Sequence, residues 1–215
     1  MTRYKAVLFD FDYTMGDTER GILASIRFAM EQMGLPEPPE EAMRRTIGKT
    51  LERTYTDLTG RTDPEEQAAF YRLFNRKAEE VMVASARLYP GTKEVLAWLE
   101  GRGIRTGVVT NKNRRRIAAI LEREGICPAV LVSAEDAAPK PAPDGILLAA
   151  GSLGLSPAEI LYVGDSPTDE EAARNAGCGF LAVLTGASEA GEFRPETAVC
   201  AGLGDLPGLL TGGRV

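Results

Sequence analysis

The segment at residues 104–125, IRTGVVTNKNRRRIAAILEREG, decides the fold class because a strand pattern gives way to a helix pattern within it. Residues 104–109 predict a strand, and residues 114–124 predict a helix. The same alternation continues on both sides, with strands expected at 129–132, 160–163 and 179–183 and helices expected at 92–100, 142–153 and 168–176. Strands that alternate with helices predict a parallel sheet covered on both faces.

Toward the N-terminus, one more strand is predicted at residues 5–9, and a block of helical signal separates it from the rest. Within this block, Ile22, Ile26 and Ala29 recur at helical spacing, and the run DPEE at residues 63–66 is typical of a helix start. We therefore predict a doubly wound, Rossmann-like α/β core formed by residues 1–15 and 87–215. A helical cap domain, residues 16–86, is inserted after strand one.

Composition limits the functions that this chain can have. It has 215 residues, a formal net charge of −6 and a pI near 5.0, which makes it a poor general nucleic-acid binder. It contains no histidine, so Ser-His-Asp catalysis and His-ligated zinc are excluded. Its three cysteines form no C-x-x-C pair, and an apolar N-terminal run is interrupted by Asp10. We expect a cytoplasmic protein that binds neither nucleic acid nor membranes.

Polar side chains follow the predicted strands at the points where the strands end. Since the carboxyl ends of parallel strands share one edge of the sheet, we expect these side chains to converge there. The residues at this edge are Asp10, Asp12, Thr110, Asn111, Lys140, Asp165 and Asp169.

The acidic residues of this edge predict a metal site. Asp10 and Asp12 are two residues apart, so in an extended chain their carboxylates point the same way and repel unless a cation lies between them. Asp165 and Asp169 add two more carboxylates, and Lys140 adds one positive charge. Ligands that are all oxygen favour Mg²⁺.

The polar residues of this edge lie in four short motifs: VLFDFDYT at 7–14, VVTN at 108–111, KPAP at 140–143 and VGDSPTDEEAARNAG at 163–177. In this order and spacing they resemble the four motifs of the haloacid dehalogenase-like hydrolase superfamily. The position of the insertion resembles the subgroup with a helical cap, which includes phosphoglycolate phosphatases and β-phosphoglucomutase-like proteins. The resemblance implies a Mg²⁺-dependent phosphatase that hydrolyses a small phosphomonoester, phosphoglycolate-like or a sugar phosphate, through an aspartyl-phosphate.

The resemblance also implies roles for individual residues. Asp10 is expected to be the nucleophile, and Asp12 the acid and base that protonates the leaving oxygen and then activates water. Thr110 and Asn111 are expected to hydrogen-bond phosphate oxygens, and Lys140 to neutralise charge on the phosphoryl group. The expected Mg²⁺ ligands are the carboxylates of Asp10 and Asp165, the backbone carbonyl of Asp12, and Asp169 directly or through water.

Two residues depart from the family pattern, and several alternatives stay open. Tyr13 stands where the family usually has glycine, which affects the turn before the cap, and Met15 stands where it usually has leucine, a conservative change. Lys140 is also compatible with a solvated loop, Asp169 with a first-turn acid, and Thr110 with a helix N-cap. A phosphosugar mutase of the same superfamily is the alternative enzyme. A non-enzymatic phospho-acceptor or binding protein is the alternative of another class.

For two basic clusters, a role in binding an anion and a plain solvated surface both stay open. Lys49 and Arg53, four residues apart in the cap, are candidates for binding an anionic group of the substrate, and a solvated helix face is the alternative. Lys112 begins a basic run with residues 114–116 beside Thr110. This run either raises the positive potential around a phosphate or is plain surface. We expect a small phosphorylated metabolite as partner and a monomer or homodimer.

Overall fold

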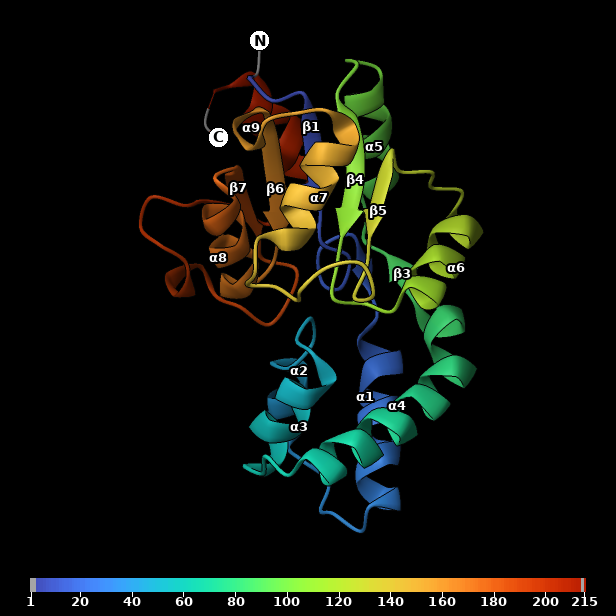
Figure 1. Ribbon diagram of the computed structural model, residues 1–215. Helices are drawn as coiled ribbons and strands as arrows, with labels where there is room; N and C mark the ends of the chain where they lie inside the picture. The colour runs from blue at the N-terminus through green and yellow to red at the C-terminus, as the bar shows by residue number, and fades with distance from the viewer. Residues whose placement is uncertain (1–2, 214) are drawn as a thin grey trace. The chain divides into compact units, whose positions relative to one another are not determined.

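The computed structural model describes residues 3–213 and 215 and divides the chain into two compact units (Figure 1). One unit comprises Met1–Gly16 and Leu88–Val215, and the other comprises Asp17–Arg87. The first contains a parallel sheet with its helices, and the second consists mainly of helices. None of the helices in the described part of the chain is long and apolar enough to cross a bilayer.

The sheet of the first unit has six strands in the order β5-β4-β1-β6-β7-β8, and neighbouring strands in it run parallel. Its strands are β1 (Ala6–Phe9), β4 (Arg105–Val109), β5 (Val130–Val132), β6 (Ile160–Gly164), β7 (Gly179–Val183) and β8 (Ala198–Cys200). The predicted parallel α/β fold is therefore confirmed. The sequence pattern did not predict β8, which forms by pairing with β7.

Strand β1 lies in the middle of the sheet because it pairs with β4 on one side and with β6 on the other. Ala6 stands opposite both Arg105 and Ile160 in these two ladders. All four residues of β1 are buried, as expected of a strand with helices on both faces. The residues that follow β1 are thereby placed at the centre of the carboxyl edge.

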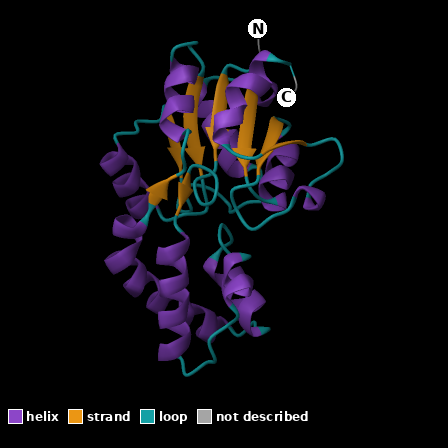
Figure 2. Cartoon of the chain, turned by 180° about the vertical axis from the view of Figure 1, so that it is seen from behind, coloured by secondary structure: helices purple, strands orange, loops and turns teal. Residues whose placement is uncertain are grey.

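Helices cover both faces of this sheet (Figures 1 and 2). They are α5 (Thr92–Glu100), α6 (Arg114–Glu124), α7 (Asp144–Leu153), α8 (Pro167–Ala176) and α9 (Leu206–Thr211). α7 and α8 pack on one face, where Ile146 and Ala172 join Leu8 and Tyr162 in a buried apolar cluster. α5 and α9 lie on the opposite face (Figure 2). The first four of these helices were predicted, and α9 was not.

The second unit contains α1 (Glu19–Gln32), α2 (Glu40–Arg44), α3 (Leu51–Thr59) and α4 (Pro64–Ser85). The predicted start of α4 is confirmed, since the Asp63 side chain accepts hydrogen bonds from the backbone N–H groups of Glu65 and Glu66. Ile26 and Phe70 are fully buried within this unit. A two-stranded ribbon, β2 (Gly16–Asp17) with β3 (Arg87–Leu88), lies where the chain passes between the units.

Candidate active site

The loop after β1 folds back tightly on itself. Asp10 continues the ladder, its N–H donating to the Val163 carbonyl at 2.9 Å, and the Phe11 carbonyl accepts from the backbone N–H groups of residues 14, 15 and 16. Tyr13 has φ 59°, a left-handed conformation that a non-glycine residue rarely adopts. The turn therefore has the left-handed conformation that glycine usually adopts, although the residue is tyrosine. The Tyr13 side chain is buried.

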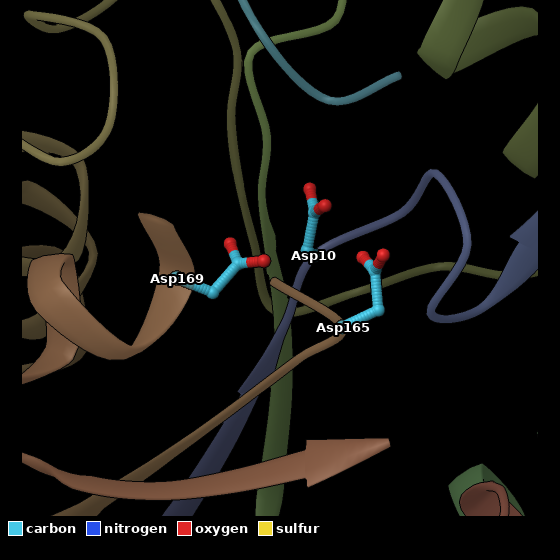
Figure 3. A group of neighbouring side chains, drawn as sticks. All are labelled: Asp10, Asp165 and Asp169. Carbon is cyan, nitrogen blue, oxygen red and sulfur yellow. The ribbon is translucent and has the colours of Figure 1, made fainter. Parts of the chain in front are cut away.

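Three carboxylates meet at this edge of the sheet (Figure 3). Asp10 comes from the end of β1, Asp165 from the loop after β6 and Asp169 from the first turn of α8; one oxygen of each lies within 4.8 Å of the others. All three are buried. The close approach depends on Gly164, because a Cβ atom there would lie 2.5 Å from Cγ of Asp169. The predicted convergence of these residues is present in the structure.

Lys140 is buried among these carboxylates rather than solvated. Its Nζ lies 2.9 Å from Asp10 Oδ1, 2.6 Å from Asp169 Oδ1 and 3.1 Å from the Tyr162 hydroxyl. The loop that carries Lys140 is held by the segment after β4, because the Lys140 N–H donates to Asn111 Oδ1 at 3.1 Å. A buried ammonium group needs such partners to offset its loss of hydration.

Asp169 makes more contacts than a first-turn acid needs. Its Oδ2 accepts from the Ser166 backbone N–H at 3.2 Å, which completes the capping box at the start of α8, and also from the Ser166 hydroxyl at 2.6 Å. Its Oδ1 accepts from Lys140 and from the Tyr162 hydroxyl, the latter at 3.2 Å. The residue therefore caps the helix and also connects it to Lys140.

Burial and like charge shift the ionisation of this cluster. Burial, followed by the nearby carboxylates of Asp169 and Asp12, raises the pKa of Asp10 to about 6 although Lys140 opposes the shift. Burial also raises the pKa of Asp165 well above its usual range, again with help from Asp169. For Lys140, burial works to lower the pKa, but the carboxylates of Asp10 and Asp169 outweigh it, so the pKa of the ammonium group is raised.

The carboxylate of Asp12 lies apart from the other three and pairs with a second lysine. Lys112 Nζ donates to Asp12 Oδ1 at 2.8 Å and to Oδ2 at 3.1 Å, and the two side chains are only 4% and 7% exposed. Two alternatives were open for the basic run that begins at Lys112: a positive potential around a phosphate, or a solvated surface. Neither includes an ion pair between Lys112 and Asp12. No local pattern indicates it, since the partner lies far away along the chain.

Thr110 and Asn111 lie directly after β4, at the same edge. Thr110 is buried, and its hydroxyl accepts from the Lys112 N–H at 3.3 Å. It is not the N-cap of α6, because that position belongs to Asn113, whose side chain accepts from the Arg116 N–H. Asn111 holds the Lys140 backbone. Both residues thus lie beside the cluster where a phosphate was expected.

Lys49 and Arg53 belong to the helical unit and share one carboxylate. Lys49 Nζ lies 2.9 Å from Asp57 Oδ2, and Arg53 Nε lies 2.8 Å from Asp57 Oδ1. They do not lie on one helix face, because α3 begins at Leu51, with Thr50 as its N-cap, and Lys49 precedes it. The two side chains meet at Asp57 instead.

The donor set of the edge suits a hard divalent cation. Four carboxylates face only two ammonium groups, so a positive charge would lower the repulsion that adds to burial in raising the pKa of Asp10. Asp10 Oδ1 is buried next to Lys140 without a hydrogen bond of good angular geometry, and oxygen ligands are those that Mg²⁺ prefers. Asp10, Asp165 and Asp169 are the residues that could hold the ion.

Two further residues of the site were missed from the sequence. The Thr14 hydroxyl donates to Asp165 Oδ1 at 3.3 Å, and the Tyr162 hydroxyl donates to the Val109 carbonyl at 2.9 Å while contacting Lys140. Thr14 stands four residues after Asp10, within the first motif, and could have been included on that basis. Tyr162 offers a weaker signal, a polar atom in an otherwise apolar strand.

Comparison with known proteins places this geometry in a family. A family model described as haloacid dehalogenase-like hydrolase matches residues 7–183. The phosphoglycolate phosphatase of Escherichia coli is 32% identical over 198 residues, covering 81% of this chain and 79% of that protein. The N-acetylmuramic acid 6-phosphate phosphatase of Pseudomonas aeruginosa is 34% identical over 194 residues, covering 86% and 83%.

Solved structures agree in fold. A crystal structure of a haloacid dehalogenase-like hydrolase from Bacteroides fragilis superposes with a TM-score of 0.91 at 37% identity, covering 94% of this chain and 99% of that one. A second, of a phosphoglycolate phosphatase predicted in Haemophilus somnus, has a TM-score of 0.87 at 27% identity and covers 97% and 99%. The motifs, the fold and the relatives agree: the chain belongs to the haloacid dehalogenase-like hydrolase family.

Proposed function

We propose that this hydrolase is a Mg²⁺-dependent phosphatase that releases inorganic phosphate from a small phosphomonoester through an aspartyl-phosphate. The observation that carries the proposal is the meeting of Asp10, Asp165, Asp169 and Lys140 at the carboxyl end of the central strand. A buried carboxylate beside a buried ammonium group is the arrangement that nucleophilic attack on an anionic phosphoryl group requires. Relatives that are named phosphatases of phosphoglycolate and of a sugar phosphate support the substrate class.

In the first step, a carboxylate oxygen of Asp10 attacks phosphorus and the bond between phosphorus and the ester oxygen breaks. Asp12 donates a proton to the departing oxygen, which leaves as an alcohol. In the second step, Asp12 takes a proton from water, the water oxygen attacks phosphorus, and the bond to Asp10 breaks to release phosphate. Splitting one displacement into two lowers the barrier of each.

The other residues of the edge bind and orient. Lys140 neutralises charge on the nucleophile and on the transferring group, and Thr110 and Asn111 offer hydrogen bonds to phosphate oxygens. Asp10 and Asp165 would hold Mg²⁺ with the Asp12 carbonyl, and Asp169 would do so directly or through water. When bound, the ion supplies positive charge that stabilises the anionic phosphoryl group.

The helical unit, residues 17–87, acts in this proposal as a cap that excludes bulk water and contributes to specificity. Lys49 and Arg53 are its candidates for contact with a second anionic group of the substrate. Both contact Asp57, so a substrate anion would have to compete with that carboxylate.

A screen of phosphorylated metabolites tests the proposal. Each compound is incubated with the full chain and Mg²⁺, and inorganic phosphate is measured with and without EDTA. We expect phosphate release from small phosphomonoesters that EDTA abolishes. Conversion of a hexose 1-phosphate to the 6-phosphate without free phosphate would instead identify a mutase. No turnover of any compound would contradict the enzymatic proposal.

A further inference from the structure

Lys112 lies in the site, yet no step proposed above uses it. Its ammonium group contacts both oxygens of the Asp12 carboxylate, at 2.8 and 3.1 Å. The pair is nearly inaccessible to solvent, with side chains 4% and 7% exposed. A buried ion pair of this kind is retained despite the cost of desolvating both charges, which favours a specific role over general stabilisation.

The backbone of Lys112 is fixed independently of its side chain. Its N–H donates to the Thr110 hydroxyl at 3.3 Å, and its carbonyl accepts from the Ala134 N–H at 3.1 Å. The first contact ties it to the end of β4, and the second ties it to the segment after β5. Lys112 is therefore a rigid point from which a side chain can hold something else.

Asp12, by contrast, lies in the tight loop between Phe11 and Gly16. Its carboxylate pairs with Lys112, whereas the ammonium group of Lys140 pairs with Asp10 and Asp169. Proton transfer requires an acid or base that is held within hydrogen-bond reach of the reacting oxygen. Contact of one donor with both carboxylate oxygens limits rotation of the group.

We propose that Lys112 is a positioning residue, which holds the Asp12 carboxylate in place for proton transfer at the leaving oxygen and at water. The inference rests on the proposed phosphatase activity and adds a residue to it. The two lysines then have separate roles, because Lys140 serves the nucleophile and Lys112 serves the acid and base. Each lysine is paired with a different aspartate of the D-x-D motif.

The decisive experiment is a double-mutant cycle with 4-nitrophenyl phosphate and Mg²⁺. Lys112→Met should lower kcat about 10- to 100-fold while KM stays within about twofold, because proton transfer is impaired and binding is kept. Lys112→Arg should recover part of the loss, since a guanidinium can also contact both carboxylate oxygens. In an Asp12→Asn background, Lys112→Met should cost less than about a further twofold.

Two results would overturn the proposal. If Lys112→Met multiplied the loss of Asp12→Asn by its full factor, or raised KM with kcat unchanged, Lys112 would act on the substrate itself. If the Lys112→Met variant had the same kcat and KM as the parent, Lys112 would have no role in turnover. Lys5→Met is the matched control: its ion pair with Glu159, at 2.6 Å, lies at the opposite end of β1, where Lys5 is 66% exposed, and turnover should not change.

A structural readout separates this inference from the phosphatase proposal. If the parent released no phosphate from any compound, the proposed function would fail, but crystal structures would still test the positioning. In Lys112→Met the Asp12 side chain should take more than one orientation, whereas in the parent it should take one. A single unchanged orientation would contradict the inference. If Lys112→Met fails to fold, the Asp12→Asn/Lys112→Met pair, which leaves no unpaired charge, provides the comparison with Asp12→Asn.

Discussion

Two lysines of the sheet edge, Lys140 and Lys112, and two basic residues of the helical unit, Lys49 and Arg53, are paired in opposite ways. At the edge, Lys140 and Lys112 have side chains that are 5% and 4% exposed, and Lys140 contacts two carboxylates. In the helical unit, Lys49 and Arg53 are 35% and 69% exposed and share a single carboxylate. Burial makes the first set depend on its partners, whereas water can replace the partner in the second. We therefore expect the folded state to depend on the two lysines of the sheet edge and to depend little on Lys49 and Arg53.

Removal of the nucleophile tests the edge most strongly. Asp10→Asn should lower phosphate release at least about a thousandfold, because an amide cannot form the acyl phosphate. Stability should change little, since Lys140 keeps Asp169 at 2.6 Å. Phosphate release with Mg²⁺ and the thermal midpoint Tm measure the two effects. Normal turnover by this variant would remove Asp10 from the nucleophile role.

Replacing Lys140 tests how much this lysine contributes to the stability of the folded protein. Lys140→Met leaves Asp10 and Asp169 buried without their cation, so we expect a loss of about 3 kcal/mol in the free energy of unfolding. Urea unfolding in metal-free buffer measures it, and activity should be lost as well. A change below about 0.5 kcal/mol in the free energy of unfolding would mean that Lys140 contributes no more to stability than an exposed ion pair does. The contrast between the sheet edge and the helical unit would then be wrong.

Metal binding should be visible in stability. Mg²⁺ at about 100 times its Kd should raise the free energy of unfolding by about 2.7 kcal/mol, because only the folded site binds it. Asp165→Asn should remove most of this gain at the same concentration, while Glu159→Gln, at the other end of the sheet, should keep it. Differential scanning fluorimetry with and without Mg²⁺ provides the measurement. An equal gain in all three proteins would contradict the assigned ligand.

The exposed pairs of the helical unit should matter to substrate rather than to folding. Lys49→Met and Arg53→Met should each change the free energy of unfolding by less than about 0.5 kcal/mol. We expect KM for the substrate found in the screen to rise about tenfold with kcat nearly unchanged, as for loss of one charged hydrogen bond. If KM does not move, these residues form a solvated surface and have no part in recognition.

The smallest effect should come from the exposed pair at the start of β1. Contact with Lys5 and the Ser156 cap lowers the pKa of Glu159 to about 2. The folded pKa lies below the unfolded one, so its stabilising contribution is present above pH 4.5 and is lost as pH falls toward 2. The Tm of the parent should slightly exceed that of Glu159→Gln at pH 7, and the difference should vanish near pH 2. A constant difference would mean that another group is responsible.

Much of the fold and part of the site could be predicted because their signals are local. A strand followed by a polar pair and a helix is visible along the chain, and the rule for parallel strands then brings Asp10, Lys140 and Asp165 to one edge. Lys112 could not be predicted in the same way. Four basic residues near a helix start are typical of a surface, and burial of the first depends on a carboxylate from another strand.

Other differences also arise from tertiary contacts. The left-handed backbone of Tyr13 is held by two hydrogen bonds: its N–H donates to the Gly16 carbonyl, and its carbonyl accepts from the Thr185 hydroxyl, a residue far along the chain that no local pattern indicates. Strand β8 owes its existence to pairing with β7. Both features depend on contacts between segments that are far apart along the chain. A single sequence indicates such contacts only where recognisable motifs lie at both places.

The central place of β1 has a consequence for the order in which the chain assembles. Its partners begin at Arg105 and Ile160, so β1 must wait during synthesis for segments that are made much later. Helices α1 and α4 can meet sooner, since they lie within one contiguous stretch, Asp17–Arg87. Contacts of long sequence separation form slowly. We therefore expect the helical stretch to become protected from hydrogen exchange before the middle of the sheet during refolding.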